Sequence, residues 1–523
     1  MSTASPAQNP AGPALSRRSL LVGAAAAATV GAGTLGGRPP AALAAAERPV
    51  HDPFTLGVAS GDPWPGGVVL WTRLAPRPLE GGGMPDRVVP VGWQVATDER
   101  FRDVVASGAE VARPDLGHSV HVEVGDLRPG AEYFYRFRVG TELSQTGRTR
   151  TAPAAHAPLD RFAFAFTSCQ NYAAGYYTAH RHMSEEDLDL VVQLGDYIYE
   201  GAPNPTQLRT HEGTGEPVTL EQYRNRHAQY RTDADLQAAH AAFPWAVVLD
   251  DHEIDNNWAD EVPQDPDRQP RDAFLARRAA AFQAYYEHMP LRRSAVPRGI
   301  DMQLYRRLTF GDLVDLHVLD TRQYRNDQVP DSRRFDPERT ILGAEQEAWL
   351  SSALAGPTAR WNVLAQQVFF SQRDFASGPA VNTSNDAWDN YAVARDRLRD
   401  HMVAASTSNP VVLTGDVHAN YVSDVKADFD DPGSATVATE LVGTSITSGG
   451  DGVDQNPSDA IQLAENPHIS FINRNRGYVR NVVTPTGWTT DFRVVDRVTV
   501  PGAPVRTRAT FVIEDGIPGA QRA

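Results

Sequence analysis

The chain is 523 residues long, which is more than one ordinary hydrophobic core organises, so we expect two domains. Its hydrophobic content of 41% and charged content of 22% are typical of a soluble globular protein. The formal net charge of -16 argues against a nucleic-acid partner and fits a protein that binds hard cations through carboxylates. Lys426 is the only lysine and no glycine-rich loop precedes it, which excludes a Walker-type nucleotide site.

The N-terminus has the features of a cleaved targeting segment. Ser16-Arg-Arg-Ser-Leu-Leu21 is a twin-arginine pattern, followed by a mildly apolar run and by small residues up to Ala46. This run is too short and too rich in glycine and alanine for a stable transmembrane helix. We therefore expect a signal peptide over residues 1–46, transport by the twin-arginine translocase, and a secreted or cell-wall associated protein without a transmembrane anchor after cleavage.

Residues 48–153 are expected to form an N-terminal all-β domain. Short β-rich stretches occur there with Gly, Pro and Asp between them, at Val68–Thr72, Val91–Val95, Ser119–Val124 and Tyr133–Val139. About one hundred residues of such strands suggest an immunoglobulin- or fibronectin-like sandwich. A segment rich in Pro and Ala, Thr151–Leu159, would link it to the rest of the chain.

Residues 158–523 alternate strands with helices, which is typical of an α/β domain. Apolar runs predict buried strands at Phe162–Thr167, Leu188–Leu194, Trp245–Leu249, Leu313–Leu319, Trp361–Ala365 and Val411–Leu413. Helical spacing predicts helices over Tyr176–Glu186, Leu220–His240, Arg271–Tyr286, Gln346–Ala355 and Asp389–Met402. The segment after Gly477 is β-rich.

Polar residues able to bind metal follow four of these apolar strands. The residues are Cys169; Asp196 with Tyr199; Asp251, His252 and Glu253 with Asn256; and Asp416 with His418. One acid after a strand is often only a helix cap, but buried carboxylates at four strand ends cost several kcal/mol each unless they are paired or bound to metal. The pattern therefore predicts a dinuclear metal site in which Asp196 bridges two cations.

The residue types also constrain the metals. A thiolate, a phenolate and an imidazole favour a transition metal, whereas carboxylates and amides favour calcium, magnesium or manganese. The two halves of the site are therefore suited to different ions. Cys169 is the only cysteine in the chain, so an internal disulfide is excluded.

The motifs resemble those of a known family in both kind and order. Ser168-Cys-Gln170, Gly195–Glu200, Asp250–Glu253 with Asn256-Asn-Trp258, and Gly415–His418 are similar to the successive motifs of the PhoD-like alkaline phosphatases. That family is a branch of the metallophosphoesterases related to purple acid phosphatases. The resemblance covers essentially the whole chain and implies a four-layer αββα sandwich preceded by the all-β domain.

The resemblance also implies an activity and its cofactors. It implies a secreted alkaline phosphatase that hydrolyses phosphate monoesters and diesters by attack of a metal-activated hydroxide, with Fe³⁺ and one or two Ca²⁺ ions bound. By position, iron would be held by Cys169, Asp196, Tyr199 and His418. Calcium would be held by Asp196, Asp251 and Asp416, with Asn256 or Asp255 as a further ligand.

Two residues are candidates for direct contact with the phosphate ester. His252 matches the histidine that contacts phosphate or protonates the leaving oxygen in related enzymes. Arg322 lies just past a strand end, and its guanidinium fork suits phosphate, with Arg231 and Arg224 as the next candidates. His227 and His240 lie in a helical stretch and are expected to be structural or exposed.

The motifs of several other hydrolase classes are missing from the sequence. A cysteine phosphatase would need arginine six residues after Cys169, where the chain has Gly175, and neither Gly-x-Ser-x-Gly nor His-Glu-x-x-His occurs at the expected places. Within the same chemistry, a phosphodiesterase or metal-dependent phospholipase D stays open, with teichoic acid or phospholipid as candidate substrates. A non-catalytic cell-wall binding protein that uses the β domain is the alternative from another class.

Overall fold

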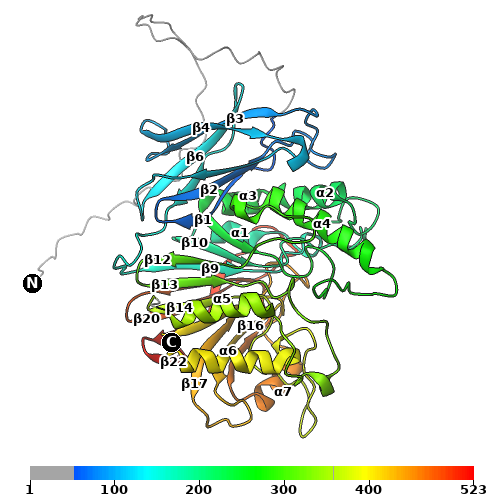
Figure 1. The fold of residues 1–523 in the computed structure, drawn as a ribbon, viewed down its shortest axis with the longest axis vertical. Coiled ribbons are helices and arrows are strands. Elements are labelled where there is room, and N and C mark those ends of the chain that lie inside the picture. Colours follow the sequence, from blue (N-terminus) through cyan, green and yellow to red (C-terminus); the bar gives the residue numbers. More distant parts are fainter. Residues whose placement is uncertain (1–51, 357–358) are drawn as a thin grey trace, which may run out of the picture. The chain divides into compact units, whose positions relative to one another are not determined.

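The computed structural model describes residues 52–356 and 359–523 (Figure 1). The signal peptide predicted over residues 1–46 lies outside the described residues. Within the described part, no helix is both long enough and apolar enough to cross a membrane. The described strands form a ten-stranded, a seven-stranded and a five-stranded sheet.

The ten-stranded sheet carries three short parallel strands at its centre. These strands are buried along their whole length: β9 (Phe162–Thr167), β10 (Leu190–Leu194) and β11 (Pro244–Val248). The C-terminal strands continue the sheet from β9, in the order β19 (Gly477–Val483), β20 (Gly487–Val495), β21 (Val505–Glu514) and β22 (Ile517–Arg522). The other side continues from β11 through β1 (Val58–Trp64), β2 (Gly67–Arg73) and β5 (Ser119–Val124).

The seven-stranded sheet faces the first one across a shared hydrophobic core. Its order is β12 (Arg306–Phe310), β13 (Val314–Val318), β14 (Trp361–Ala365), β15 (Pro410–Thr414), β17 (Thr436–Val442), β16 (Asn420–Lys426) and β18 (Ile469–Asn473). Phe162 stacks on Phe310 at 4.2 Å between ring centroids, and Trp361 contacts Trp488 at 5.7 Å, so aromatic pairs join the two sheets. Burying these large rings is a main source of the fold's stability.

The strands of the N-terminal region belong to two sheets that share a hydrophobic core, but one of these sheets continues into the rest of the fold. Its five-stranded sheet consists of β3 (Val89–Ala96), β4 (Val104–Ala112), β6 (Glu132–Val139), β7 (Glu142–Leu143) and β8 (Gly147–Arg150). The strands β1, β2 and β5 instead belong to the ten-stranded sheet, because Ser60 and Gly61 of β1 pair in parallel with Pro244 and Trp245 of β11. The boundary expected at residue 153 is therefore not a boundary between sheets.

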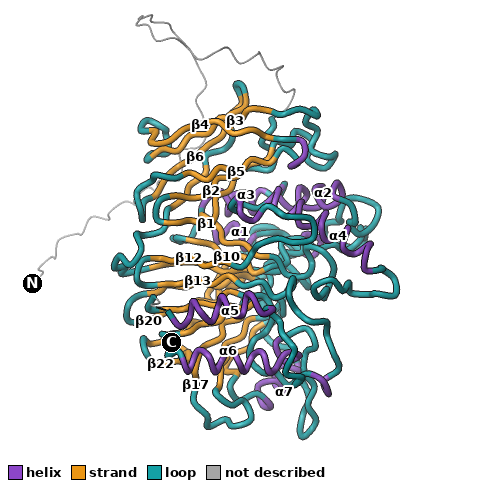
Figure 2. The backbone as a smooth tube through the Cα atoms, viewed as in Figure 1, coloured by secondary structure: helices purple, strands orange, loops and turns teal. Residues whose placement is uncertain are grey.

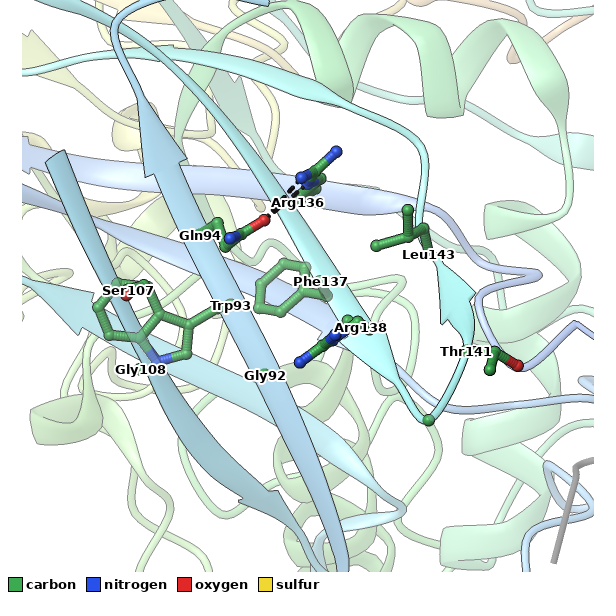
Figure 3. A pocket seen from close by; sticks show the side chains of 11 residues that line it. Gly92, Trp93, Gln94, Ser107, Gly108, Arg136, Phe137, Arg138, Thr141 and Leu143 are labelled. Carbon is green, nitrogen blue, oxygen red and sulfur yellow. Dashed lines mark hydrogen bonds between the residues drawn. The ribbon is translucent and has the colours of Figure 1, made fainter. Parts of the chain in front are cut away.

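The five-stranded sheet carries a groove of about 580 Å³ (Figure 3). Trp93, Gln94, Arg136 and Arg138 are among the residues that line it. The guanidinium of Arg136 donates two hydrogen bonds to Gln94 Oε1 at 2.9 and 2.7 Å, and it stacks on Phe101. The groove takes no part in the metal centre described below.

Helices cover the outer faces of the two large sheets (Figure 2). The ten-stranded sheet is covered by α1 (Thr178–Met183), α2 (Leu220–Arg231), α3 (Ala234–Ala242) and α4 (Arg271–His288). The seven-stranded sheet is covered by α5 (Gly343–Ala355) and α6 (Ala392–Ala404), and α7 (Pro457–Glu465) contacts β18. Short 3₁₀ turns occur at Pro114–Leu116, Tyr172–Ala174, Arg293–Ala295, Asp331–Arg333 and Trp388–Tyr391.

The single helix expected over Leu220–His240 is two helices. The break falls at Thr232, and Asp233 begins the second helix because its carboxylate accepts hydrogen bonds from the backbone N–H groups of Asp235 and Leu236. Aspartate stabilises the start of a helix, so Asp233 favours a second helix over continuation of the first.

The turn after β10, which leads to the candidate metal ligand Asp196, is tightly packed. Gly195 has a φ of +105°, and a Cβ atom there would lie 2.3 Å from Cβ of Asp250. Gly195→Ala should therefore lower the free energy of unfolding by about 2–4 kcal/mol, measured as a lower denaturation midpoint by calorimetry.

Gly201→Ala is the matched control, because a Cβ at Gly201 meets nothing within 4 Å. Equal denaturation midpoints for the two variants would contradict the packing argument for Gly195.

Candidate metal centre

Loops that follow β9, β10, β11 and β15 bring metal-binding side chains together. Ligand atoms of Cys169, Asp196 and His418 lie within 4.8 Å of one another, and those of Asp196, Asp251 and His252 form a second group within the same limit. Asp196 belongs to both groups, so its carboxylate is close to a thiol and an imidazole in one group and to the Asp251 carboxylate and the His252 imidazole in the other.

Several residues of this centre have a left-handed backbone conformation, which residues other than glycine rarely adopt. Left-handed φ values are found at Cys169 (57°), Asp196 (55°), Asp416 (62°) and His418 (53°). Such non-glycine residues cost about 1–3 kcal/mol each and persist where the surrounding structure fixes them, which is often at functional sites. Four residues of the predicted metal site share this conformation. Their backbone therefore supports a functional site independently of their side-chain types.

Hydrogen bonds between the loops hold these backbones in place. The backbone N–H of Cys169 donates to Gly195 O, and that of Gln170 donates to Asp196 O, both at 3.1 Å. The carboxylate of Glu253 accepts from the backbone N–H of Asp196 at 3.2 Å and of Tyr197 at 2.5 Å. It also accepts from the backbone N–H of Asp250 at 2.9 Å. One buried carboxylate thus fixes the loops after β10 and β11 together.

Tyr199 joins the two halves of the first group. Its hydroxyl donates to Asp196 Oδ2 at 2.8 Å and lies 3.1 Å from His418 Nε2. The hydroxyl of Ser448 lies 2.7 Å both from the Tyr199 hydroxyl and from the backbone oxygen of Cys169. The phenol is therefore positioned beside the same atoms that would bind a metal.

His252 is oriented by an acid that sequence reasoning did not single out. Its Nδ1 lies 2.7 Å from Glu200 Oε2, and its ring stacks on Tyr199 with 4.1 Å between centroids. Burial alone lowers the pKa of His252, but the carboxylates of Glu200, Asp251 and Asp196 outweigh this effect and raise the pKa well above its usual value. The structure thus favours a protonated imidazole.

Arg322 is fully buried, and its donors are directed at carboxylates. Its Nε donates to Asp250 Oδ1 at 2.5 Å, and its two terminal nitrogens donate to the carboxylate of Asp386 at 2.8 and 2.7 Å. Its Nη2 also lies 3.7 Å from Asp251 Oδ2. This geometry fits a residue that neutralises and positions acids, and it differs from the phosphate contact expected from the sequence.

The other arginines and histidines considered from the sequence lie elsewhere. Arg224 forms a salt bridge with Glu287, and Arg231 stacks over Trp71. His227 and His240 are buried, as expected of structural residues, and His240 stacks on Trp245.

Arg476 is a second buried arginine at the centre. It donates from Nη1 to the backbone oxygen of His418 at 2.6 Å and from Nε to Gly450 O at 2.8 Å. Burial, together with the charges of Arg476 and His252, lowers the pKa of His418 to about 3. A neutral imidazole is the form that can bind a metal.

Asp416 and Asn256 stand outside the two close groups. Asp416 is on the same loop as His418, and burial with the nearby acids Asp386 and Asp251 raises its pKa to about 7. Asn256 donates its backbone N–H to Glu200 Oε1 at 3.0 Å. Asp255 is less suited as a ligand, because it pairs with Arg277 at 3.0 Å.

The electrostatics of the described residues fit a bound cation. Burial raises the pKa of Asp196, against the opposing charge of His252. Burial also raises the pKa of Cys169, and the carboxylates of Asp196 and Asp416 raise it further. Asp196 Oδ1 is buried without a hydrogen-bond partner. A cation would remove this like-charge repulsion and satisfy the free oxygen, and thiol, phenol, imidazole and carboxylate are suitable ligands for it.

Comparisons with known proteins agree with this geometry. Residues 164–492 match the family model described as PhoD-like phosphatase, and residues 40–153 match the one described as PhoD-like phosphatase, N-terminal domain. The chain belongs to the PhoD-like phosphatase family. It is therefore an enzyme that hydrolyses phosphate esters, which confirms the resemblance seen in its motifs.

Two relatives place this PhoD-like phosphatase more closely. The chain is 53% identical to alkaline phosphatase D of Bacillus subtilis (strain 168) over 482 residues, which cover 90% of this chain and 82% of the relative. A solved structure titled Structure of PhoD superposes with a TM-score of 0.89 and 53% identity. That superposition covers 91% of this chain and 93% of the solved chain.

Four residues were not predicted from the sequence, and they hydrogen-bond to the candidate ligands or to the loops that carry them. They are Glu200, Glu253, Ser448 and Arg476. Glu200 and Glu253 lie within the motifs, and their acidic type next to a predicted ligand was an available signal. Ser448 and Arg476 follow the candidate ligands at long distance in the sequence, and no local pattern marks them. Such outer partners orient metal ligands, and losing one commonly costs about 10–100-fold in metal affinity or activity.

Cys169 provides a direct test of the centre. Cys169→Ala should lower bound metal and phosphatase activity together, each by about 10–100-fold or more, because it removes the only sulfur atom beside Asp196 and His418. Metal analysis and activity assays on the same preparation measure both.

Ser352→Ala is the control, since Ser352 is an exposed residue of α5 and takes no part in the candidate metal centre. A Cys169→Ala variant with its full metal content and activity would contradict the assignment.

Proposed function

We propose that this PhoD-like phosphatase is an exported alkaline phosphatase whose centre binds two unlike cations through one shared carboxylate. The observation that carries the proposal is the position of Asp196, which belongs to both close groups of ligand atoms. Export rests on the twin-arginine pattern at Arg17 and Arg18, which predicts passage through the twin-arginine translocase and a secreted or cell-wall associated location.

The donor types support iron for one cation and calcium for the other. Iron, as Fe³⁺, is assigned to the group with the thiol and imidazole, which is Cys169, Asp196, Tyr199 and His418. Calcium, as one or two Ca²⁺ ions, is assigned to the oxygen ligands Asp196, Asp251, Asp416 and Asn256. When bound, the cations supply Lewis-acid polarisation of the phosphoryl oxygens and of the attacking water.

His252 is the proposed general acid. Its Nδ1 is bonded to Glu200, so its Nε2 is the nitrogen left to donate a proton to the leaving oxygen of the ester. The raised pKa keeps that proton in place until the bond to the leaving group breaks. Stacking on Tyr199 fixes the plane of the His252 ring, so the N–H bond at Nε2 points in one direction.

Arg322 and Arg476 are proposed as positioning residues. Arg322 holds Asp250 and Asp386 behind the carboxylate half, and it offsets part of the repulsion between the acids there. Arg476 holds the His418 backbone in its left-handed conformation by binding its carbonyl oxygen. Neither guanidinium is placed to bind phosphate directly while these bonds exist.

The proposed substrates are phosphate monoesters and diesters. The relative from Bacillus subtilis is named alkaline phosphatase D, which supports monoester hydrolysis. Hydrolysis of diesters, such as teichoic acid or, in a phospholipase D reaction, phospholipid, proceeds by the same chemistry. Assays with both ester types distinguish the two activities.

The first functional test is removal of the metals. The purified protein should release p-nitrophenol from p-nitrophenyl phosphate, lose that activity with a chelator, and regain it with iron and calcium. Circular dichroism should stay unchanged, because the core between the sheets consists of apolar side chains. Bis-p-nitrophenyl phosphate and phosphatidylcholine, assayed beside the monoester, give the preference among ester types.

Full activity in protein stripped of metal would overturn the proposal. Protein that binds both metals and hydrolyses none of the three esters would favour the alternative of a cell-wall binding protein.

The second test uses the bond between Glu200 and His252. Glu200→Gln removes a negative charge that raises the pKa of His252, so the imidazole should lose its proton at lower pH. Because the protonated form is the active one, the alkaline limb of the kcat/KM profile should move to lower pH by about one to three units.

Glu212→Gln serves as the matched control, since Glu212 is an exposed acid in the same loop between β10 and α2. A shift of the alkaline limb to higher pH, or no shift, would contradict the role given to His252.

A further inference from the structure

Arg373 is a buried arginine in the segment that follows β14. The residue is 6% exposed, and its guanidinium carbon lies 4.1 Å from the ring centroid of Phe369 and 4.8 Å from that of Phe375. The ring of Tyr421 is 5.4 Å away. Three aromatic rings therefore hold a charged group in one place, and stacking of this kind suits the planar guanidinium of arginine better than the ammonium of lysine.

The side chain of Arg373 has no acceptor among the described residues. No hydrogen bond or salt bridge from its guanidinium is found there, and its Nε is buried without a partner. The nearest acid by hydrogen bonding is Asp389, which accepts the backbone N–H of Arg373 at 2.9 Å. Its carboxylate is already bound by Arg395 at 2.6 Å.

Buried charges are normally paired, because leaving one unpaired costs on the order of several kcal/mol. Arg322, Arg325 and Arg395 each bind a carboxylate. Arg231 resembles Arg373, because it stacks over Trp71 and its Nε and Nη2 are buried without a partner. Arg373 is distinguished from Arg231 by its position next to the candidate metal ligands.

The segment of Arg373 borders the metal centre. The backbone N–H of Gly415, next to Asp416, donates to Gln367 O at 2.8 Å. Val417 packs against the hydrophobic cluster that contains Phe369 and Tyr421. Tyr421 in turn lies three residues after His418. The guanidinium is therefore beside the loop that carries two candidate metal ligands.

The positive charges of Arg322 and Arg373 both act on Asp416 of that loop. An anion bound at the metals would lie within the same field. Arg322 cannot serve as its ligand while it holds Asp386, whereas Arg373 is free to do so among the described residues.

We propose that Arg373 binds a second phosphate group of the substrate while the metal centre holds the phosphate that is cleaved. The guanidinium fork matches two oxygens of a phosphate, and the aromatic rings fix it before the substrate arrives, so little conformational entropy is lost on binding. The favoured substrate class is then a bisphosphate, an ester that carries two phosphate groups. The inference rests on the proposed function.

The test compares a bisphosphate with a monophosphate of the same carbon chain. Release of inorganic phosphate is measured for 1,3-propanediol bisphosphate, 1,5-pentanediol bisphosphate and propyl phosphate, with the metal-loaded full chain. Wild-type protein should prefer at least one bisphosphate in kcat/KM. In Arg373→Gln that preference should fall by about 10–100-fold, mainly through KM, which is the effect of one charge-assisted hydrogen bond.

Two further variants keep the test decisive. Arg373→Lys retains the charge without the fork and should restore part of the preference, even if Arg373→Gln folds poorly. Arg360→Gln is the control, because Arg360 is a surface arginine paired with Asp515 and should leave all three activities unchanged.

Binding of an uncleavable probe separates recognition from turnover. Propane-1,3-bisphosphonic acid should bind the wild-type protein more tightly than propylphosphonic acid by calorimetry, and Arg373→Gln should remove this difference. Equal affinities in the wild type, or a difference that survives in Arg373→Gln, would overturn the role of Arg373.

Different results would contradict the role of Arg373 and the proposed function. Wild-type protein that cleaves propyl phosphate without any preference for bisphosphates contradicts only the role of Arg373. Wild-type protein that releases phosphate from none of the three esters contradicts the proposed function itself.

Discussion

The structure depends on burying several like-charged groups in one place. Asp196, Asp250 and Asp251 meet the thiol of Cys169 at the edge of the ten-stranded sheet, where little water can reach them. Burial and mutual repulsion both oppose this arrangement. Arg322 and the backbone N–H groups compensate part of the cost, and the free oxygen of Asp196 marks where positive charge is still needed. Bound cations would therefore stabilise this edge, whereas the apolar core between the sheets does not depend on them.

The frame around the charges is made mainly of backbone. Left-handed residues follow the ends of β9, β10 and β15, and each would relax if its neighbours allowed it. Bonds between the loops, with Glu253 binding two of them, prevent that relaxation. The side chains are consequently held at fixed distances before any ligand arrives, which lowers the conformational cost of binding.

Much of the fold and of the candidate site follows from the sequence, because both depend on local patterns. Continuous apolar runs gave β9 and β14 their bounds, and ligands such as Asp196 come directly after such runs. The pairing of β1 with β11 has no local signal, so the N-terminal region was expected to be a separate sandwich. The direction of the Arg322 side chain likewise depends on Asp386, which is distant in sequence. Patterns within one segment predict its structure, whereas contacts between distant segments decide the roles of single side chains.

The position of β19 has a consequence for biosynthesis. This strand pairs with β9, and the nearby Ser448 contacts the residue that follows β9. Both belong to the last part of the chain to leave the ribosome. The strand that precedes Cys169 therefore gains one of its two neighbouring strands only after residues 477–483 have been synthesised.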